Sequence, residues 1–268
     1  MDLGSITLEH GARAYSIDRG CVDEGAQSPV IEPIVKLFVG LYRLFNIALW
    51  AIFLTLFAMV VLAGVYRFVD PNLTLTMLER RLDGEEVQRQ WSPIQSISPH
   101  LVDAVIAAED TQFCQHKGID FDAIETAIAD AEQGKRLRGA STISQQTAKN
   151  VFLFNGGGWA RKGVEAGLTI VIETLWPKRR IIEVYLNVAE WGDGVFGAEA
   201  AARARFGKSA ASLTQQEAAL LASVLPNPHK WRVDPPGPYV RKRARQVRAR
   251  MRQIHRDGLN DCVANSKG

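Results

Sequence analysis

Residues 101–120 read LVDAVIAAEDTQFCQHKGID and contain the strongest helix signal of the chain. Four apolar residues recur at the spacing of one helix face: Leu101, Val102, Val105 and Ile106. Two acidic residues, Glu109 and Asp110, stand at the end of this run, and Gly118 supplies a stop. The stretch therefore predicts a core helix that carries carboxylates at or near its C-terminus.

The residues that follow contain further helix boundaries and no long alternating strand. Asp120 or Asp122 can cap a second helix, which Gly134 ends. Capping-box pairs precede two more apolar runs: Thr142 with Gln145, and Thr214 with Glu217. These signals predict a mainly α domain, closed by a basic helix from about Tyr239 to Arg256.

A long uncharged stretch lies nearer the N-terminus. Residues 44–66, LFNIALWAIFLTLFAMVVLAGVY, carry no charge, and as a helix they would span about 35 Å, against a hydrocarbon core of about 30 Å. A cleaved signal peptide begins closer to residue 1 and has a shorter apolar core. The stretch therefore predicts an uncleaved membrane anchor, with a buried core helix as the alternative.

Charge and cysteine content leave the orientation and the compartment open. Basic residues flank the apolar stretch on both sides, so the positive-inside rule does not decide: Lys36 and Arg43 before it, and Arg67, Arg80 and Arg81 after it. The three cysteines are too few and too scattered to indicate a disulfide framework or a metal site: Cys21, Cys114 and Cys262.

Glu109 could act as a base. A carboxylate near a helix C-terminus faces the negative end of the helix dipole, which disfavours its ionised form and makes it a better proton acceptor. If the helix continues to His116, then Glu109, Phe113 and His116 share one face and could line a cleft. The alternative is a solvated acidic helix end followed by a glycine stop.

Residues 135–150, KRLRGASTISQQTAKN, place basic residues before a helix start rich in hydroxyls and amides. Free N–H groups at a helix N-terminus and nearby cations suit phosphate. An ordinary capped helix beside a solvated basic loop explains Thr142 and Gln145. It does not explain the density of the other polar residues: Ser141, Ser144, Gln146, Lys149 and Asn150. Both interpretations stay open.

Two further basic segments also allow two interpretations each. Arg161, Lys162 and Glu165 can share a helix face, either as an anion site beside an acid or as an i,i+4 ion pair worth a few tenths of a kcal/mol. Residues 241–256, RKRARQVRARMRQIHR, either contact anionic lipid or form a solvated basic helix.

Four segments, in this order, resemble the glycosyltransferase domain of peptidoglycan transglycosylases, glycosyltransferase family 51. They are EDTQFCQHKGID (109–120), RGASTISQQTAKN (138–150), RKGVE (161–165) and IIEVYLNVAEWGDGVFG (181–197). Together they are far more specific than any one alone. No serine is followed three residues later by lysine and no KTG occurs, so the transpeptidase signature is absent. The chain resembles the monofunctional members of the family.

The resemblance implies a mainly α, lysozyme-like, bilobed domain in the periplasm of a bacterium. The organisation it implies is a cytoplasmic tail at 1–43, one inner-membrane span at 44–66, a connector at 67–89, the glycosyltransferase domain at 90–235 and a basic C-terminal helix and tail at 236–268. It implies polymerisation of lipid II into β-1,4 glycan strands, with inversion and release of undecaprenyl diphosphate. The implied partners are lipid II, the nascent strand and the inner membrane. Other cell-wall synthesis or division proteins are candidates, and no nucleic acid is implied.

The resemblance also assigns roles to residues. Glu109 matches the catalytic base that deprotonates the acceptor sugar's 4-hydroxyl, and Glu165 matches the second essential carboxylate. The positions that line the cleft and meet the phosphosugar correspond to Asp110, Arg138, Ser141, Gln145, Gln146, Lys149, Asn150, Arg161 and Lys162. No cofactor is implied and no ligand cluster demands a metal, although assistance by a divalent cation stays open.

The sequence departs from the family at two positions. Ser144 stands where threonine is common and keeps the hydroxyl. Gly157 stands where many members carry an arginine, so a diphosphate contact is either missing or supplied by Arg161, Lys162 or another basic residue. We expect Gly157→Arg to raise activity or leave it unchanged, provided that the side chain does not clash.

Two other functions fit parts of the pattern. A lysozyme-like hydrolase or lytic transglycosylase also uses a glutamate in an α-helical cleft, but it has no diphosphate for the basic segment 135–150 to hold. A membrane-anchored scaffold could bind lipid II without turnover. Intact Glu109, Lys149 and Glu165 argue against the scaffold.

Overall fold

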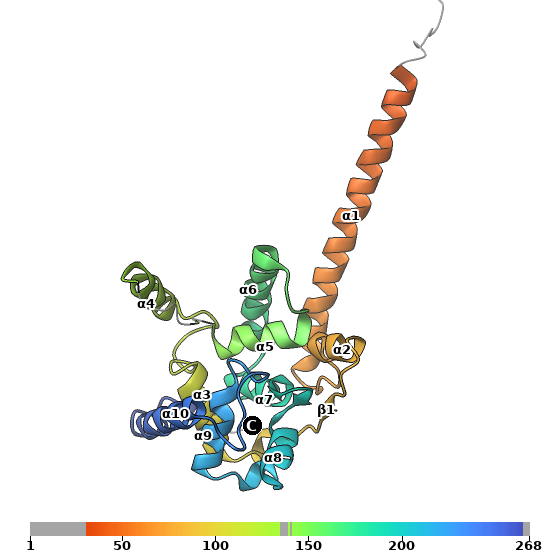
Figure 1. The fold of residues 1–268 in the computed structure, drawn as a ribbon. Helices are drawn as coiled ribbons and strands as arrows, with labels where there is room; N and C mark the ends of the chain where they lie inside the picture. Colours follow the sequence, from red (N-terminus) through yellow and green to blue (C-terminus); the bar gives the residue numbers. More distant parts are fainter. Residues whose placement is uncertain (1–30, 135–138, 140, 265–268) are drawn as a thin grey trace, which may run out of the picture. The chain divides into compact units, whose positions relative to one another are not determined.

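The computed structural model describes residues 31–134, 139 and 141–264 of the 268-residue chain. The chain divides into two compact units, residues 1–53 and 54–268. Helix α1 (Ile31–Tyr66) supplies the described part of the first unit and the beginning of the second, which holds all other elements (Figure 1).

Helix α1 is 36 residues long and begins before the span expected at 44–66. Residues 33–66 have the length and apolar composition of a membrane-spanning helix. Large side chains such as Phe38, Trp50 and Phe57 are more than half exposed. The alternative of a buried core helix does not fit this exposure.

The second unit is mainly α, as the sequence predicts. Its helices are α2 (Leu75–Leu82), α3 (Pro99–Glu109), α4 (Phe121–Glu132), α5 (Ile143–Phe152), α6 (Gly158–Leu175), α7 (Lys178–Val188), α8 (Ala198–Phe206), α9 (Gln215–Val224), α10 (Pro238–Arg256) and α11 (Asp261–Ala264), with 3₁₀ turns η1 (Ile94–Ser96) and η2 (Ala210–Ser212). Both expected capping boxes are present, at the starts of α5 and α9. The Asp120 side chain caps α4.

Three very short strands complete the unit: β1 (Gln88–Arg89), β2 (Glu190–Gly192) and β3 (Val195–Phe196). Their order is β1-β3-β2, with β3 parallel to β1 and antiparallel to β2. In the parallel pair, Gln88 lies opposite Val195 and Arg89 opposite Phe196. The sheet therefore joins the segment before α3 to the turn that follows α7.

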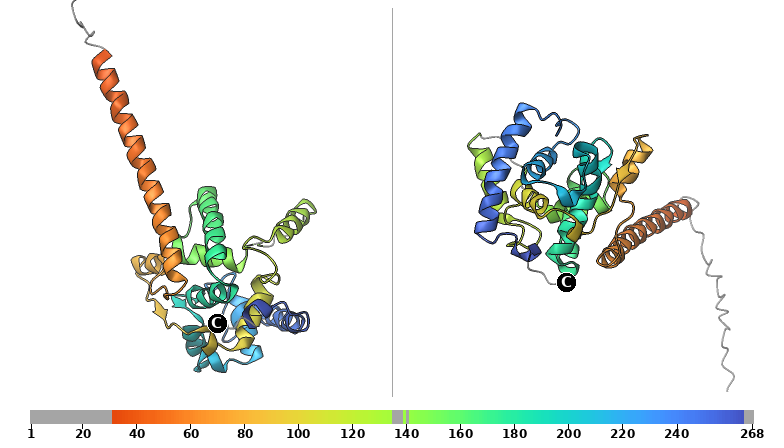
Figure 2. Two further views of the ribbon diagram at one scale, coloured as in Figure 1. Left: turned by 180° about the vertical axis from the view of Figure 1, so that it is seen from behind. Right: turned by 90° about the horizontal axis from the view of Figure 1, so that it is seen from below.

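Two groups of helices form most of the core. Helices α3, α9 and α10 pack on one another, and α5 packs against α6 and α7 (Figures 1 and 2). Most of α3 is buried, as expected from its run of apolar residues. Helix α4 has no buried residue and stands apart from both groups (Figure 1).

The segment expected to be a connector, residues 67–89, is part of the compact unit. Met77 is buried, and Thr76 Oγ1 donates a hydrogen bond to the Asn150 carbonyl at 3.2 Å. Helix α2 is therefore packed against α5, and the folded unit begins well before residue 90.

A disulfide joins Cys114, in the loop after α3, to Cys262 in α11, with the two Cα atoms 5.6 Å apart. This bond was not expected, because 148 residues separate the two cysteines in the sequence. The packing of α10 on α3 brings the C-terminal segment back to this loop. The bond ties the loop that follows Glu109 to α11.

Candidate active site

Glu109 is the last residue of α3, so this helix does not continue to His116. The backbone leaves the helix at Asp110, with φ −160° and ψ 79°. The Asp110 carboxylate accepts a hydrogen bond from the N–H of Ile143, the first residue of α5, at 3.0 Å. This bond joins the end of α3 to the start of α5. Phe113 is fully buried in the core and does not line a cleft.

Two donors hold the Glu109 carboxylate. Gln146 Nε2, on α5, donates to Oε2 at 3.0 Å, and Arg243 Nη2, on α10, lies 3.4 Å from Oε1. Burial raises the pKa of Glu109 above its ordinary value, although Gln146 and Arg243 both oppose the shift. A carboxylate with a raised pKa is a stronger base, which suits a general base that works near neutral pH.

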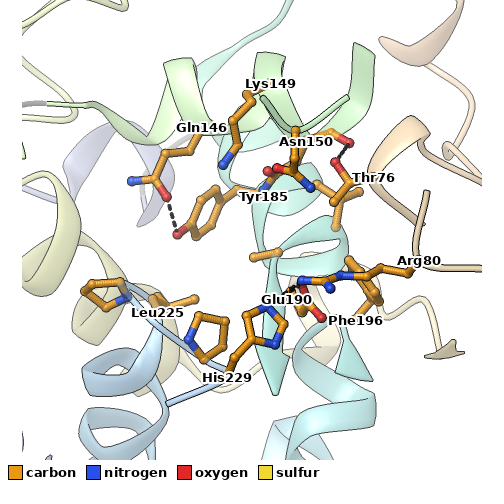
Figure 3. A pocket seen from close by; sticks show the side chains of 15 residues that line it. Thr76, Arg80, Gln146, Lys149, Asn150, Tyr185, Glu190, Phe196, Leu225 and His229 are labelled. Atoms are coloured by element: carbon orange, nitrogen blue, oxygen red, sulfur yellow. Dashed lines mark hydrogen bonds and ion pairs between the residues drawn. The ribbon is translucent and has the colours of Figure 1, made fainter. Parts of the chain in front are cut away.

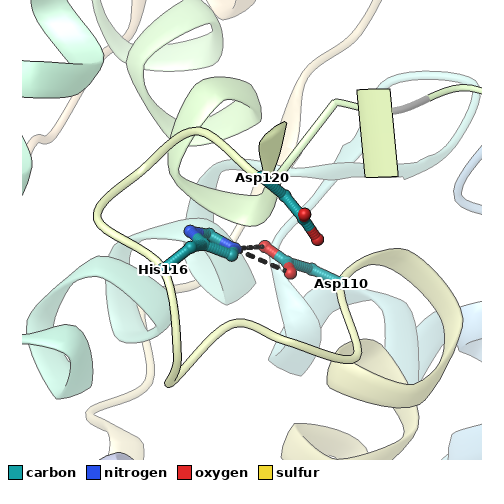
Figure 4. A group of neighbouring side chains, drawn as sticks. All are labelled: Asp110, His116 and Asp120. Atoms are coloured by element: carbon teal, nitrogen blue, oxygen red, sulfur yellow. Dashed lines mark hydrogen bonds and ion pairs between the residues drawn. The ribbon is translucent and has the colours of Figure 1, made fainter. Parts of the chain in front are cut away.

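Asp110, His116 and Asp120 lie together in the loop between α3 and α4 (Figure 4), with one potential metal-ligating atom of each within 4.8 Å of the others. His116 Nε2 lies 2.9 Å and 3.1 Å from the two Asp110 oxygens. Its Nδ1 accepts from the Gly118 N–H at 3.1 Å, which makes Nε2 the donor. Asp120 Oδ1 accepts from the Ala123 N–H at 2.8 Å. These hydrogen bonds occupy both His116 ring nitrogens and brace the loop.

The first residues of α5 form hydrogen bonds that fix the start of this helix. Gln145 Oε1 accepts from the Thr142 N–H at 3.0 Å, and Thr142 Oγ1 donates to the Gly118 carbonyl at 2.5 Å. Ser144 is fully buried and donates to Glu173. The Gln145 oxygen, expected to face substrate, is thus used within the cap.

Glu165 lies inside a cluster of charges near the start of α6 and is 2% exposed. Arg161 Nη1 donates to Oε2 at 2.8 Å. Lys162 bonds to Oε1 and also donates from Nζ to Ser141 Oγ at 3.3 Å. A buried carboxylate needs opposite charges and hydrogen bonds beside it. This cluster therefore differs from the exposed i,i+4 ion pair that the sequence also allowed. Two cations and one carboxylate leave it positive overall.

Gly157 is the N-cap of α6 and has a φ of +82°. A Cβ at this position would lie 2.9 Å from Arg161 Cβ. Arg161 Nε in turn donates to the Gly156 carbonyl. The glycine turn therefore helps to position the arginine that bonds to Glu165. The expectation that Gly157→Arg raises activity or leaves it unchanged required room for the side chain, and this conformation does not provide it, because a side chain is strained at this φ.

A cavity of about 220 Å³ opens between α2, α5, α7, β2 and the loop after α9 (Figure 3). Lys149 and Asn150 line it from α5, and the Lys149 amino group points into it. Among the described residues, this amino group has no hydrogen-bond or ion-pair partner. Burial lowers the pKa of Lys149, while the Glu165 carboxylate opposes the shift. An unpaired ammonium in a polar cavity is available to an anion.

Four titratable residues of this cavity were missed in the sequence: Arg80, Tyr185, Glu190 and His229. Arg80 Nη2 lies 3.2 Å from Glu190 Oε2, and His229 Nε2 lies 3.4 Å from the same oxygen. Burial raises the pKa of Glu190, against the effect of His229 and Arg80. Tyr185 and Glu190 lie within the fourth motif, and this position is the one sequence feature that could have identified them. Arg80 lay in the expected connector, and His229 lay outside all four motifs.

The structure brings most of the expected site residues into two neighbouring sets. Glu109 is bonded to Gln146, and Glu165 is bonded to the two cations of α6. Helix α5 connects the sets, because Lys149 follows Gln146 by one turn and lies close enough to Glu165 for that charge to affect its pKa. Arg138 lies outside the described residues.

Comparison with known proteins identifies the family of the chain. The sequence model of the transglycosylase family matches residues 76–252. A biosynthetic peptidoglycan transglycosylase of Rhodospirillum centenum is 56% identical over 206 residues, which cover 76% of this chain and 89% of that protein. Proteins of the same name from Caulobacter vibrioides and Pseudomonas aeruginosa are 50% and 51% identical over 223 and 221 residues, covering 83% and 80% of this chain and 97% and 94% of theirs. The resemblance drawn from the four motifs is confirmed: the chain belongs to the transglycosylase family.

Proposed function

We propose that the chain is a monofunctional peptidoglycan glycosyltransferase, which polymerises lipid II into β-1,4 glycan strands with inversion and releases undecaprenyl diphosphate. One observation carries this reaction: helix α5 positions the largely buried Glu109 carboxylate through Gln146 and also carries Lys149, whose ammonium has no partner among the described residues. Gln146 on this helix bonds to Glu109, and Lys149 follows one turn later. Family membership and the names of the relatives support the same activity.

In this proposal Glu109 is the general base. The acceptor's 4-hydroxyl gives its proton to the Glu109 carboxylate, and its oxygen forms a bond to the donor's anomeric carbon. The bond from that carbon to the diphosphate oxygen breaks on the opposite face, and the leaving group keeps the electron pair. A positioned base contributes roughly 10²–10⁴ in rate, and the raised pKa of Glu109 suits this task.

The cations of α5 and α6 stabilise the departing diphosphate. Lys149 is unpaired among the described residues and faces the cavity (Figure 3). Arg161 and Lys162 are fixed on Glu165, so these charges are in place before the diphosphate leaves. Preorganised charge of this kind acts where charge develops in the transition state. In this account, Glu165 acts through the cations it holds.

We infer that α1 is a single inner-membrane anchor, N-in, with the catalytic unit in the periplasm. A lipid-linked substrate favours a membrane-bound enzyme, and large apolar side chains stay exposed around α4 and α6: Phe121, Ile128, Phe154, Trp159 and Ile170. The Cys114–Cys262 disulfide suits an oxidising compartment. Reporter fusions after residue 268 test the topology. A reporter active only in the cytoplasm would refute both the orientation and the proposed reaction.

The reaction is tested with the purified full chain in detergent, given lipid II and no other enzyme. Wild type should yield long glycan strands and undecaprenyl diphosphate. Glu109→Gln should still bind lipid II but lose at least roughly 10²-fold in turnover, because the amide cannot accept the proton. A hydrolase would instead shorten preformed glycan, and a scaffold would bind lipid II and release nothing. Either result would contradict the proposal.

A further inference from the structure

The hydrogen bond that holds Glu109 depends on how the Gln146 amide is oriented. Gln146 Nε2 donates to Glu109 Oε2 at 3.0 Å. Its other end, Oε1, accepts from the Tyr185 hydroxyl at 3.2 Å (Figure 3). A side-chain amide presents a donor on one end and an acceptor on the other. One residue therefore links the carboxylate to the phenol.

This orientation follows from the partners. An ionised carboxylate only accepts hydrogen bonds, so the amide nitrogen must face Glu109. The amide oxygen is then left for Tyr185, which can donate because it keeps its proton. Burial raises the pKa of Tyr185 well above its ordinary value, and the charges of Glu109 and Asp110 add to the shift. A rotated amide would place two acceptors, its oxygen and the carboxylate, against each other.

Tyr185 is well placed to prevent that rotation. It lies on α7, which packs against α5, and it is 1% exposed. The ring packs among the core residues, and this packing fixes the position of the hydroxyl that bonds to Gln146. The phenol is therefore a fixed donor at the edge of the cavity, and no ordering is needed when substrate binds.

We propose that Tyr185 is a positioning residue of the catalytic base: its hydroxyl fixes the Gln146 amide so that the amide N–H holds the Glu109 carboxylate. This role rests on the proposed function of Glu109. Tyr185 itself acts through Gln146, because its hydroxyl bonds to the amide oxygen and the amide nitrogen bonds to the carboxylate.

The first test is Tyr185→Phe in the full-length enzyme, which keeps the ring and removes the donor. Turnover of lipid II should fall roughly 3- to 10-fold, the equivalent of one ordinary hydrogen bond. The acidic limb of the pH–rate profile should move to higher pH, because ionised Glu109 loses part of its donated hydrogen bond. Tyr239→Phe is the control, since that ring is half exposed and stacks on Trp231. It should change neither value.

The second test asks whether the effect passes through Gln146. In a Gln146→Met background, Tyr185→Phe should cause no further loss, because the linked amide is gone. An equal loss in both backgrounds would mean that the hydroxyl acts by another route. An unchanged rate and pH profile in Tyr185→Phe would also overturn the positioning role of Tyr185. The proposed reaction would still stand in that case if wild type polymerises lipid II.

The third measurement does not need turnover. The pKa of Glu109 can be followed by ¹³C NMR of glutamate-labelled protein in detergent, with Glu109→Gln identifying the resonance. Tyr185→Phe should raise this pKa, and Tyr239→Phe should leave it as in wild type. An unmoved pKa would refute the positioning role. Wild type that fails to polymerise lipid II would refute the function separately.

Discussion

Arg243 and Glu109, 134 residues apart in sequence, meet where α10 crosses the end of α3. Arg243 Nη2 lies 3.4 Å from Glu109 Oε1 and donates to the Ala108 carbonyl at 3.3 Å. Arg250, on the same helix, donates to the Ala107 carbonyl at 3.4 Å. Both arginines thus bind the end of α3, but only Arg243 reaches the carboxylate. The basic segment 241–256 therefore supplies a contact to the Glu109 carboxylate, which neither interpretation of its sequence included.

Replacing Arg243 by methionine should move the acidic limb of the pH–rate profile to higher pH. The Arg243 charge favours the ionised form of Glu109, so its loss adds to the upward shift that burial causes. Activity needs ionised Glu109 and is lost as the pH falls through its pKa. Below neutral pH the variant should consequently be slower than wild type, and the difference should shrink as the pH rises.

Arg250→Met is the matched control for Arg243→Met. It removes a contact to the same turn of α3 without touching the carboxylate. The acidic limb should stay in place, even if the melting temperature falls. An equal shift in both variants would mean that the helix end, rather than the charge beside Glu109, sets the pH dependence.

Lys149→Met should lower kcat and kcat/KM together, by roughly 10²-fold. Removing one preorganised donor aimed at developing charge typically costs 10²–10³ in kcat, and equal losses identify an interaction made in the transition state. Lys242→Met, on the exposed side of α10, removes the same charge elsewhere and should be near wild type. A rise in KM with kcat unchanged would instead assign Lys149 to ground-state binding.

Gly157→Ala should destabilise the unit by roughly 1–3 kcal/mol, because its φ of +82° disfavours a side chain and the new Cβ lies 2.9 Å from Arg161 Cβ. Gly163→Ala, inside α6 with no atom near the added Cβ, should be neutral or stabilising. Thermal unfolding of both variants measures the difference. Equal melting temperatures would show that the turn tolerates a side chain.

Removing the disulfide should lower stability by about 2–4 kcal/mol. Cys114→Ser combined with Cys262→Ser should melt earlier than wild type and lose turnover, because the loop after Glu109 is no longer tied to α11. Cys21→Ser controls for the loss of a thiol outside this pair. Thiol titration of the denatured protein should find two more thiols after reduction than before. Equal counts would show that the bond does not form.

The features that depend on neighbours in sequence could be predicted. The capping boxes at Thr142 and Thr214, the cap at Asp120 and the position of Glu109 at a helix end all follow from residues within one turn of each other. The pairing of Arg161 with Glu165 follows from helical spacing in the same way.

The features that depend on packing could not be predicted. Periodicity does not reveal that Asp110 breaks α3 by bonding to the N–H of Ile143, which is 33 residues away. Nor does it place Arg80 in the cavity, because the neighbours of α2 are set by its contact with α5. Tyr185 was visible only as part of a motif. Its bond to Gln146 spans 39 residues and exists because α5 packs on α7.

The spacing of Gln146 and Lys149 on α5 makes this helix a rigid spacer between two functional groups of the site. Three residues of helix set the step between the group that holds the base and the ammonium that faces the cavity, about 4.5 Å along the axis. One residue inserted between them would turn Lys149 by about 100° about that axis and aim it away from the cavity. An insertion near either end of α5 could be absorbed there. An insertion in its middle turn would instead separate the base that removes the proton from the ammonium that stabilises the leaving group.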